Sequence, residues 1–327
     1  MNPRALLSLR GLVSAAISVG IVASLLGFLG DHHWTLDLFS HFRVQYMIGA
    51  TILLLATVVL RQRRNALVAS FGLLLNASLV LPLYWPPGQA PDSRAPVLKV
   101  LYANVLSHND GYSGLLEWID SEQPDIIALL EVSKEWKEAL DPSLLAWPYQ
   151  ESRPRDDNFG IAVYSRFPLQ EVSWPVLTPT GSQSLFATLQ WQNHEVPFLL
   201  VHPYPPIKRY AATTARAQIE ELILRKEVSH ELALLVGDLN TTPWSHTSRR
   251  LNTTTLRPAR LGFGVLSTWP AKLPAPFRIP IDTILAGPRW SVQDLRVGPD
   301  FGSDHLPLVA HLTPLLPSSD RTTGTSR

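Results

Sequence analysis

Three long apolar stretches without a charged residue occupy the start of this chain. They run over residues 12–29, 44–60 and 66–85, and only Asn76 and Pro82 interrupt the third. About 17–25 apolar residues cross a bilayer as a helix, so the sequence predicts three transmembrane helices. The second is at the short limit, which a locally thinned bilayer accommodates. We interpret Asn76 as a tolerated polar residue rather than as an interhelical hydrogen-bonding group.

Basic residues near these stretches predict the orientation of the anchor. Arginines precede the first stretch and fill the RQRR link between the second and third, whereas the loop over residues 30–43 has only Arg43. Arginine and lysine concentrate on the cytoplasmic side. We therefore expect a multi-pass protein of the cytoplasmic membrane, with a cytoplasmic N-terminus and an extracytoplasmic remainder. A cleaved signal peptide is the alternative, but GFLGDHH is a poor cleavage site.

The rest of the chain divides by composition. Residues 1–85 form the predicted membrane anchor, 86–96 a short extended linker, 97–315 a catalytic domain and 316–327 a polar, disordered tail. Residues 90–327 carry 22 basic and 25 acidic residues, so this part is mildly acidic. The chain has no cysteine, which excludes disulfides and thiolate metal sites.

Short apolar segments from residue 97 onward predict β-strands. They are VLKVLYANV, DIIALLEV, GIAVYSR, SLFATLQW, VPFLLVHPY, LALLVGDL, IDTILAG and LPLVAHL, bounded by Pro, Gly, Asn or Asp. Helical spacing of apolar residues predicts helices over 112–123 and 213–228. An N-cap serine at the start of 133–140 predicts a third. Several strands follow one another without a helix. The pattern therefore indicates two packed sheets flanked by helices rather than one doubly wound parallel sheet.

Polar residues end or open many of these strands. The set consists of Asn104, Glu131, His202, Asp238, Asn240, Asp282, Asp304 and His305. Each has an ordinary explanation as a turn or surface residue. Asp238 and Asn240, for example, either form a turn or, as residues i and i+2 of a strand, face one spot. Strand ends of one orientation meet at one edge of a sheet, so we expect the set to converge.

Oxygen ligands with few nitrogens suit a hard divalent cation. The expected cofactor is Mg²⁺, with Mn²⁺ as the alternative. A cation beside an Asp–His pair is the equipment for attack of water on phosphorus.

The same segments carry a family resemblance. NVLSHN, PDIIALLEVS, NFGIAVYSR, LLVHPYPP, LLVGDLNTTPWS, PIDTILAG and GSDHLPLVAHL occur in the order found in the endonuclease/exonuclease/phosphatase (DNase I-like) superfamily. The outer domain resembles that superfamily over its whole length, and the chain is similar to its bacterial membrane-anchored members. The resemblance implies an α/β fold, a four-layered α/β sandwich, preceded here by three transmembrane helices.

The resemblance also implies roles for single residues. Glu131 would be the main metal ligand, supported by Asn104 and Asp304. Asp238 would orient and deprotonate the attacking water, and Asn240 would bind a phosphate oxygen. His305 would contact the scissile phosphate while Asp282 fixes its tautomer, and His202 would protonate the leaving oxygen. Candidate substrate contacts are Trp244, Trp269 and Asn109, although core packing also explains the two tryptophans.

The sequence predicts a phosphoesterase without fixing its substrate. A phospholipid headgroup, a small phosphoester and a nucleic acid stay open, and no obligate protein partner is evident. Basic residues at 208–209, 249–250, 257 and 260 would grip a polyanion or are ordinary surface residues. A membrane-tethered binding or sensor module that keeps the fold without turnover is the alternative from another class.

Overall fold

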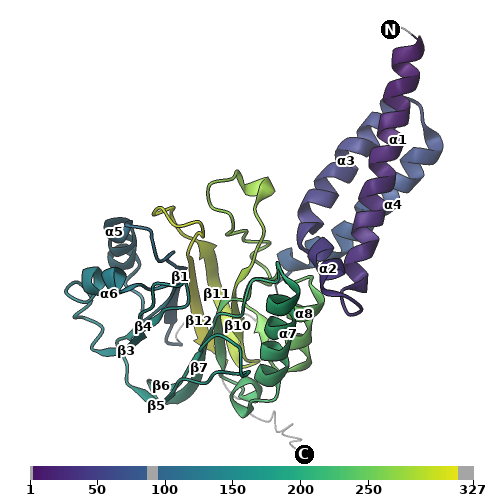
Figure 1. Ribbon diagram of the computed structural model, residues 1–327. Coiled ribbons are helices and arrows are strands. Elements are labelled where there is room, and N and C mark those ends of the chain that lie inside the picture. Colours follow the sequence, from purple (N-terminus) through teal and green to yellow (C-terminus); the bar gives the residue numbers. More distant parts are fainter. Residues whose placement is uncertain (1–2, 87–94, 316–327) are drawn as a thin grey trace, which may run out of the picture.

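Three long helices form a bundle at the start of the computed structural model, which describes residues 3–86 and 95–315. They are α1 (Pro3–Leu26), α3 (Arg43–Val59) and α4 (Arg63–Val80) (Figure 1). Three segments, Ser8–Leu29, Trp34–Val59 and Arg63–Tyr84, are long and apolar enough to span a membrane. The second is longer than expected because a short helix α2 (Trp34–Asp37) and the 3-10 turn η2 (Leu38–Phe42) precede α3.

The bundle exposes much apolar surface. Leu12 is 65% exposed, Leu67 74% and Val59 81%, although each lies within or at the end of a regular helix. A soluble domain would bury such side chains against a core. Exposed apolar side chains along all three helices are typical of a bundle that faces lipid.

Asn76 departs from expectation. It is 1% exposed, and its Nδ2 donates to Ser24 Oγ of α1 at 3.0 Å. Its Oδ1 accepts a 3.4 Å hydrogen bond from Arg43 of α3. Our interpretation of a merely tolerated polar residue was wrong, because Asn76 connects all three helices through polar groups that lipid cannot satisfy.

The remaining chain forms two six-stranded sheets. One has the order β11-β12-β1-β2-β4-β3 and the other β5-β6-β7-β8-β10-β9. Their strands are β1 (Leu98–Asn104), β2 (Ile126–Leu130), β3 (Tyr149–Arg153), β4 (Ile161–Ser165), β5 (Leu169–Ser173), β6 (Leu185–Trp191), β7 (His194–Val201), β8 (Leu234–Asp238), β9 (Arg257–Pro258), β10 (Asp282–Ala286), β11 (Trp290–Val297) and β12 (Leu308–Pro314). The predicted α/β sandwich is confirmed.

Alternation along the strands builds the layers. In β1, Val100 and Tyr102 enter a core shared by both sheets. Their neighbours Leu101 and Ala103 face the opposite way, into a core beneath α5 (Tyr112–Glu122) and α6 (Lys134–Leu140). The second sheet has a corresponding outer core beneath α7 (Arg209–Ile223). Successive side chains of a strand point to opposite faces, so central strands that are buried on both faces hold two cores at once.

Several elements at the edges of the sheets were not predicted from the sequence. Strands β3 and β5 have exposed or half-buried side chains throughout and therefore lack an apolar signature. The short helix α8 (His246–Arg250) and strand β11 were also not predicted. Helix α7 begins four residues earlier and ends five residues earlier than the predicted range 213–228. The predicted linker falls largely, and the predicted tail wholly, outside the described residues.

The loop between α1 and α3 contacts the sandwich directly. Asp37 is 6% exposed and its Oδ1 accepts a 2.7 Å hydrogen bond from the backbone N–H of His246, the first residue of α8. Nδ1 of His41 lies 3.1 Å from Oγ1 of Thr242. The carbonyl of Leu83 accepts hydrogen bonds from the N–H groups of Gly262 and Gly264. The bundle and the sandwich therefore share buried polar contacts.

Gly237 allows β7 and β8 to lie close together. A Cβ atom at this position would lie 1.9 Å from the carbonyl oxygen of Val201. We expect Gly237→Ala to destabilise the protein by about 1–3 kcal/mol or more, because backbone rather than a flexible side chain must move. The melting temperature of the full chain measures this. Gly49→Ala is the control, since a Cβ there meets no atom within 4 Å, and equal melting temperatures of the two variants would contradict the argument.

Candidate functional site

Four of the predicted site residues lie on the same face of their strands as the side chains of the core between the two sheets. Val100 and Tyr102 lead to Asn104 in β1, Leu200 leads to His202 after β7, Val236 leads to Asp238 in β8, and Ile284 lies two residues from Asp282 in β10. Since alternate residues share a face, all four point between the two sheets. The period-2 pattern that fills the core thus also places these polar groups together at its end.

Strand pairing brings the same ends into register. Asp238 pairs with Asp282 across the antiparallel strands β8 and β10. Val201 pairs with Gly237, which sets His202 beside Asp238. In the other sheet Asn104 pairs with Leu130, which sets it beside Glu131. Parallel neighbouring strands have their C-terminal ends at the same edge of a sheet, and an antiparallel neighbour begins at that edge. The edge, which we call the rim, therefore carries residues from the ends of some strands and from the starts of others.

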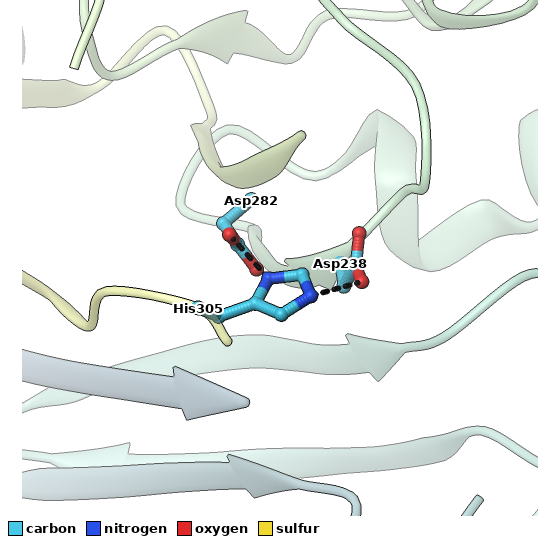
Figure 2. A group of neighbouring side chains, drawn as sticks. All are labelled: Asp238, Asp282 and His305. Carbon is cyan, nitrogen blue, oxygen red and sulfur yellow. Dashed lines mark hydrogen bonds and ion pairs between the residues drawn. The ribbon is translucent and has the colours of Figure 1, made fainter. Parts of the chain in front are cut away.

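His305 lies between two aspartates in this rim (Figure 2). Its Nδ1 is 2.9 Å from Oδ2 of Asp282, and its Nε2 is 3.7 Å from Oδ2 of Asp238. The second oxygen of Asp282 accepts a 2.7 Å hydrogen bond from the hydroxyl of Tyr102. With Nδ1 bonded to Asp282, His305 directs Nε2 towards Asp238.

The aspartates determine the charge of His305. Burial alone would disfavour the imidazolium, but the carboxylates of Asp282 and Asp238 outweigh burial and raise the pKa of His305 to about 10. Burial raises the pKa of Asp282, but the charge and the hydrogen bond of His305 outweigh burial and lower that pKa below its usual value. His305 is therefore a buried cation at neutral pH, held by an ionised Asp282.

Glu131 and Asp304 supply carboxylate oxygens without partners. Asn104 Nδ2 donates to Oε1 of Glu131 at 2.8 Å, whereas Oε2 is buried and has no hydrogen-bond partner among the described residues. Asp304 accepts a 3.1 Å hydrogen bond from Trp269 Nε1 on Oδ2, while its Oδ1 is likewise buried without one. Burial raises the pKa of Glu131 to about 7. A divalent cation is a suitable partner for such a carboxylate oxygen, so the donor chemistry of these residues fits a metal.

The trio Asp238, Asp282 and His305 also clusters tightly, with ligand atoms within 4.8 Å of one another. Asp282 and His305 already bond each other directly, and Tyr102 takes the other oxygen of Asp282. These contacts leave Asp282 no free oxygen for a cation. Glu131 and Asp304, each with an oxygen that has no hydrogen-bond partner in the described part of the chain, are therefore candidates for holding a metal beside this hydrogen-bonded trio.

Asp238 and Asn240 meet differently than strand geometry predicted. Strand β8 ends at Asp238, and Asn240 has a left-handed backbone with φ 51°. Its N–H donates to Oδ1 of Asp238 at 2.7 Å, which is an Asx turn, and its Nδ2 donates to the carbonyl of Pro203 at 3.0 Å. The shared-face argument for Asn240 was wrong because the strand ends too early. The turn interpretation of this segment is confirmed, and the turn itself holds Asp238 beside His305.

His202 completes the cluster on the β7 side. Its Nε2 lies 3.7 Å from Asp238 Oδ2 and 3.9 Å from Glu131 Oε1. Burial, followed by the charge of His305, lowers the pKa of His202 to about 3. The ring is neutral at pH 7, so the structure gives no support to the expected role of His202 as proton donor.

The three expected substrate contacts lie in different places. Trp269 is half-buried, and its ring centroid is 6.5 Å from that of His305, so it borders the cluster. Trp244 is buried, and its Nε1 donates to the carbonyl of Leu79 in α4. Asn109 caps its own loop through Val105 O and the N–H of Gly111, and it lines a separate cavity of about 270 Å³. Only Trp269 is beside the charged groups.

The supporting roles of three residues were not predicted from the sequence. These residues are Tyr102; Ser303, whose Oγ donates to Asn104 O and accepts from the N–H of His305; and Arg260, which donates to the carbonyl of Asp282. Tyr102 carried a usable signal, because it precedes Asn104 by two residues and so shares its face. Arg260 is 3% exposed and is thus no surface grip for a polyanion.

Comparison with solved structures places this fold. The Neisseria 3' phosphatase NExo bound to a product DNA hairpin is 20% identical, with a TM-score of 0.54 over 65% of this chain and 98% of that one. D. rerio TDP2 complexed with a single-strand DNA product is 16% identical, with a TM-score of 0.57 over 68% and 100%. An AP endonuclease from Archaeoglobus fulgidus is 16% identical, with a TM-score of 0.52 over 65% and 98%. At these identities the likeness shows the fold.

The sequence itself identifies the family. No curated protein matches the chain. The family model described as Endonuclease/Exonuclease/phosphatase family matches residues 101–305, a range that contains all eight polar strand-end residues. The family comprises phosphodiesterases, nucleases and phosphatases, which are hydrolases of phosphoesters. The chain belongs to the endonuclease/exonuclease/phosphatase family.

Proposed function

We propose that this protein is a membrane-anchored phosphoesterase that uses Mg²⁺, or Mn²⁺, to hydrolyse a phosphoester by in-line attack of water. The observation that carries the proposal is the convergence of Glu131, Asp238 and His305 within one buried rim. Buried carboxylates without partners are costly, and a site that keeps them is typical of metal and proton chemistry.

The residues take separate roles in this proposal. Glu131 and Asp304 hold the metal, and Asn104 orients Glu131 through its 2.8 Å hydrogen bond. When bound, the metal supplies Lewis-acid charge stabilisation for phosphoryl oxygens. His305 donates from Nε2 to the phosphate as a cation. This donor is preorganised, because Asp282 and Tyr102 fix the ring before substrate arrives.

Asp238 is the proposed base. Burial raises its pKa to about 7, although the nearby His305 cation opposes the shift. A base with a pKa near the working pH accepts a proton from water efficiently. Asn240 donates its backbone N–H to Asp238, and its amide has a second hydrogen that remains for a phosphate oxygen. The neutral His202 would serve as a hydrogen-bonding neighbour rather than as an acid.

A lipid headgroup or small phosphoester is the favoured substrate class. The solved relatives bound to DNA keep a nucleic acid open. Here, however, residues 90–327 are net acidic, and Arg250 pairs with Glu220 at 2.7 Å. Backbone contacts from free Lys and Arg supply most nonspecific nucleic-acid affinity. Of the suggested grip, Arg260 is buried and Arg250 is paired, which weakens the case for a nuclease.

The first prediction concerns the metal. We expect the full chain to hydrolyse bis-p-nitrophenyl phosphate with Mg²⁺, to lose activity with EDTA and to regain it with added Mg²⁺. Glu131→Gln should lower kcat/KM at least about 100-fold, because it removes a charge from the ligand itself. Glu138→Gln is the control, since Glu138 is exposed on α6. Turnover that survives both EDTA and Glu131→Gln would remove the metal mechanism, and Mg²⁺ binding without any turnover would favour the sensor module.

The second prediction concerns pH. In Asp282→Asn the main charge that raises the pKa of His305 is gone while burial still opposes the imidazolium, so that pKa should fall from about 10. The variant should lose activity as pH rises through this lowered pKa, whereas the wild type stays active towards pH 10. We expect a loss of about 10²–10⁴-fold at pH 8. Kinetics across pH 5–10 measure this, with the exposed Asp120→Asn as control, and superimposable profiles would refute the role of Asp282.

The third prediction concerns the membrane. We propose that all three helices cross the cytoplasmic membrane and that residues 97–315 form the extracytoplasmic catalytic domain. The chain has no cysteine, so single cysteines report cleanly. A membrane-impermeant maleimide added to intact spheroplasts should label Lys272→Cys, in the domain, and should label Arg63→Cys, at the start of α4, only after permeabilisation. The reverse pattern would invert the proposed orientation.

A further inference from the structure

A cavity of about 390 Å³ lies where the helix bundle meets the sandwich. Three of its lining residues are the arginines Arg43, Arg249 and Arg257. Its apolar wall includes Phe28, Leu79 and Trp244. None of the residues assigned above to metal, water or phosphate lines this space, which we call the junction cavity.

The arginines of the junction cavity lack a counter-charge. Among the residues that the structure describes, none of the three forms an ion pair with a carboxylate. Arg43 is 1% exposed, and it donates to the Ser24 carbonyl at 2.7 Å and to Asn76 Oδ1 at 3.4 Å, both neutral. Its Nε is buried without a partner. The Arg43 guanidinium stacks on the Phe28 ring at 4.5 Å but has no carboxylate of the described residues within ion-pair distance, so the cavity is suited to a negatively charged ligand.

The other two arginines are accessible from outside. Arg249 and Arg257 are exposed, and their hydrogen bonds go only to backbone carbonyls, at Ser245 for the first and at Thr254 and Leu256 for the second. Guanidinium groups keep further hydrogens in a planar fork that matches phosphate oxygens. A basic rim therefore faces an apolar wall inside one cavity, which suits a ligand with a phosphate and an adjoining apolar part.

The position of the cavity favours a lipid over a free ion. Phe28 and Leu79 lie near the C-terminal ends of α1 and α4, on the side of the bundle that faces the sandwich. At the same end, Tyr84 is 54% exposed and Trp85 71% exposed. Exposed Tyr and Trp mark the interface between a bilayer and water, where phosphate headgroups lie. This step rests on the membrane insertion proposed above.

We propose that the junction cavity binds one anionic phospholipid, with its phosphate on the three arginines and its upper acyl region on the apolar wall. A free phosphate shares the phosphoryl chemistry but has no use for the wall. Arg43 makes the buried contact, and Arg249 and Arg257 close the rim. The bound lipid joins the bundle to the sandwich at a place separate from the catalytic rim.

The test measures binding without relying on turnover. The full chain in a neutral detergent is titrated with phosphatidylglycerol, phosphatidylcholine or inorganic phosphate. The melting temperature and native mass spectrometry are the two readouts. We expect phosphatidylglycerol to raise the melting temperature and to remain bound one to one, and the other two ligands to do neither. The double variant Arg249→Gln/Arg257→Gln should weaken phosphatidylglycerol binding about tenfold or more.

Two variants separate the alternatives. Arg250→Gln removes the same charge one residue away, from a side chain outside the cavity, and should bind the lipid like the wild type. Glu131→Gln should also bind normally, and loss there would mean that the lipid sits in the catalytic rim as a substrate, which overturns the proposal. Equal binding of phosphatidylcholine, full occupancy by inorganic phosphate, or unchanged binding by the double variant would each overturn it too.

Discussion

The buried Asp282–His305 pair is the interaction on which the candidate site depends. It is an ion pair taken out of water, and such a pair is stable only when its remaining hydrogen-bonding groups are satisfied. Tyr102 from one sheet provides that bond to Asp282 of the other sheet, and Arg260 holds the Asp282 backbone carbonyl. The same contacts that make the pair tolerable also tie the two sheets together at the reactive end. The same hydrogen bonds therefore stabilise the fold and fix the His305 ring in position.

The opposite pKa shifts of the clustered groups follow from the same burial. The pKa of His305 is raised because the carboxylates of Asp282 and Asp238 outweigh burial, whereas the pKa of His202 is lowered by burial and then by the nearby His305 cation. The pKa values of Glu131 and Asp238 are both raised to about 7, because burial disfavours the charged carboxylate. Groups of one chemical type are thus separated into different roles by their surroundings, which is how a site combines a fixed cation with a proton acceptor.

The helix bundle contributes more than an anchor in this structure. Asp37 holds the first N–H groups of α8, and His41 contacts Thr242, only two residues beyond Asn240. The loop that leaves Asp238 is therefore fixed on one side by Pro203 O and on the other by the bundle. The junction cavity lies against the continuation of that loop, at Pro243 and Trp244. The helix bundle, this loop and the polar rim therefore form a continuous series of contacts.

The sequence by itself determined the three apolar helices, the two-sheet α/β class and the central strands, because long apolar runs and alternating buried strands leave a local pattern. It also identified the polar residues at the strand ends. Tyr102 and Asn104 are two residues apart in β1, so their common face could have been inferred from the sequence. Only the tertiary structure decided which of these groups meet. The three-helix contacts of Asn76 and the neutral His202 depend on neighbours far away in the chain. The edge strands β3 and β5 are held by pairing with β4 and β6 rather than by an apolar pattern of their own. Burial, register and charge proximity are properties of the packed molecule, and no local run of residues encodes them.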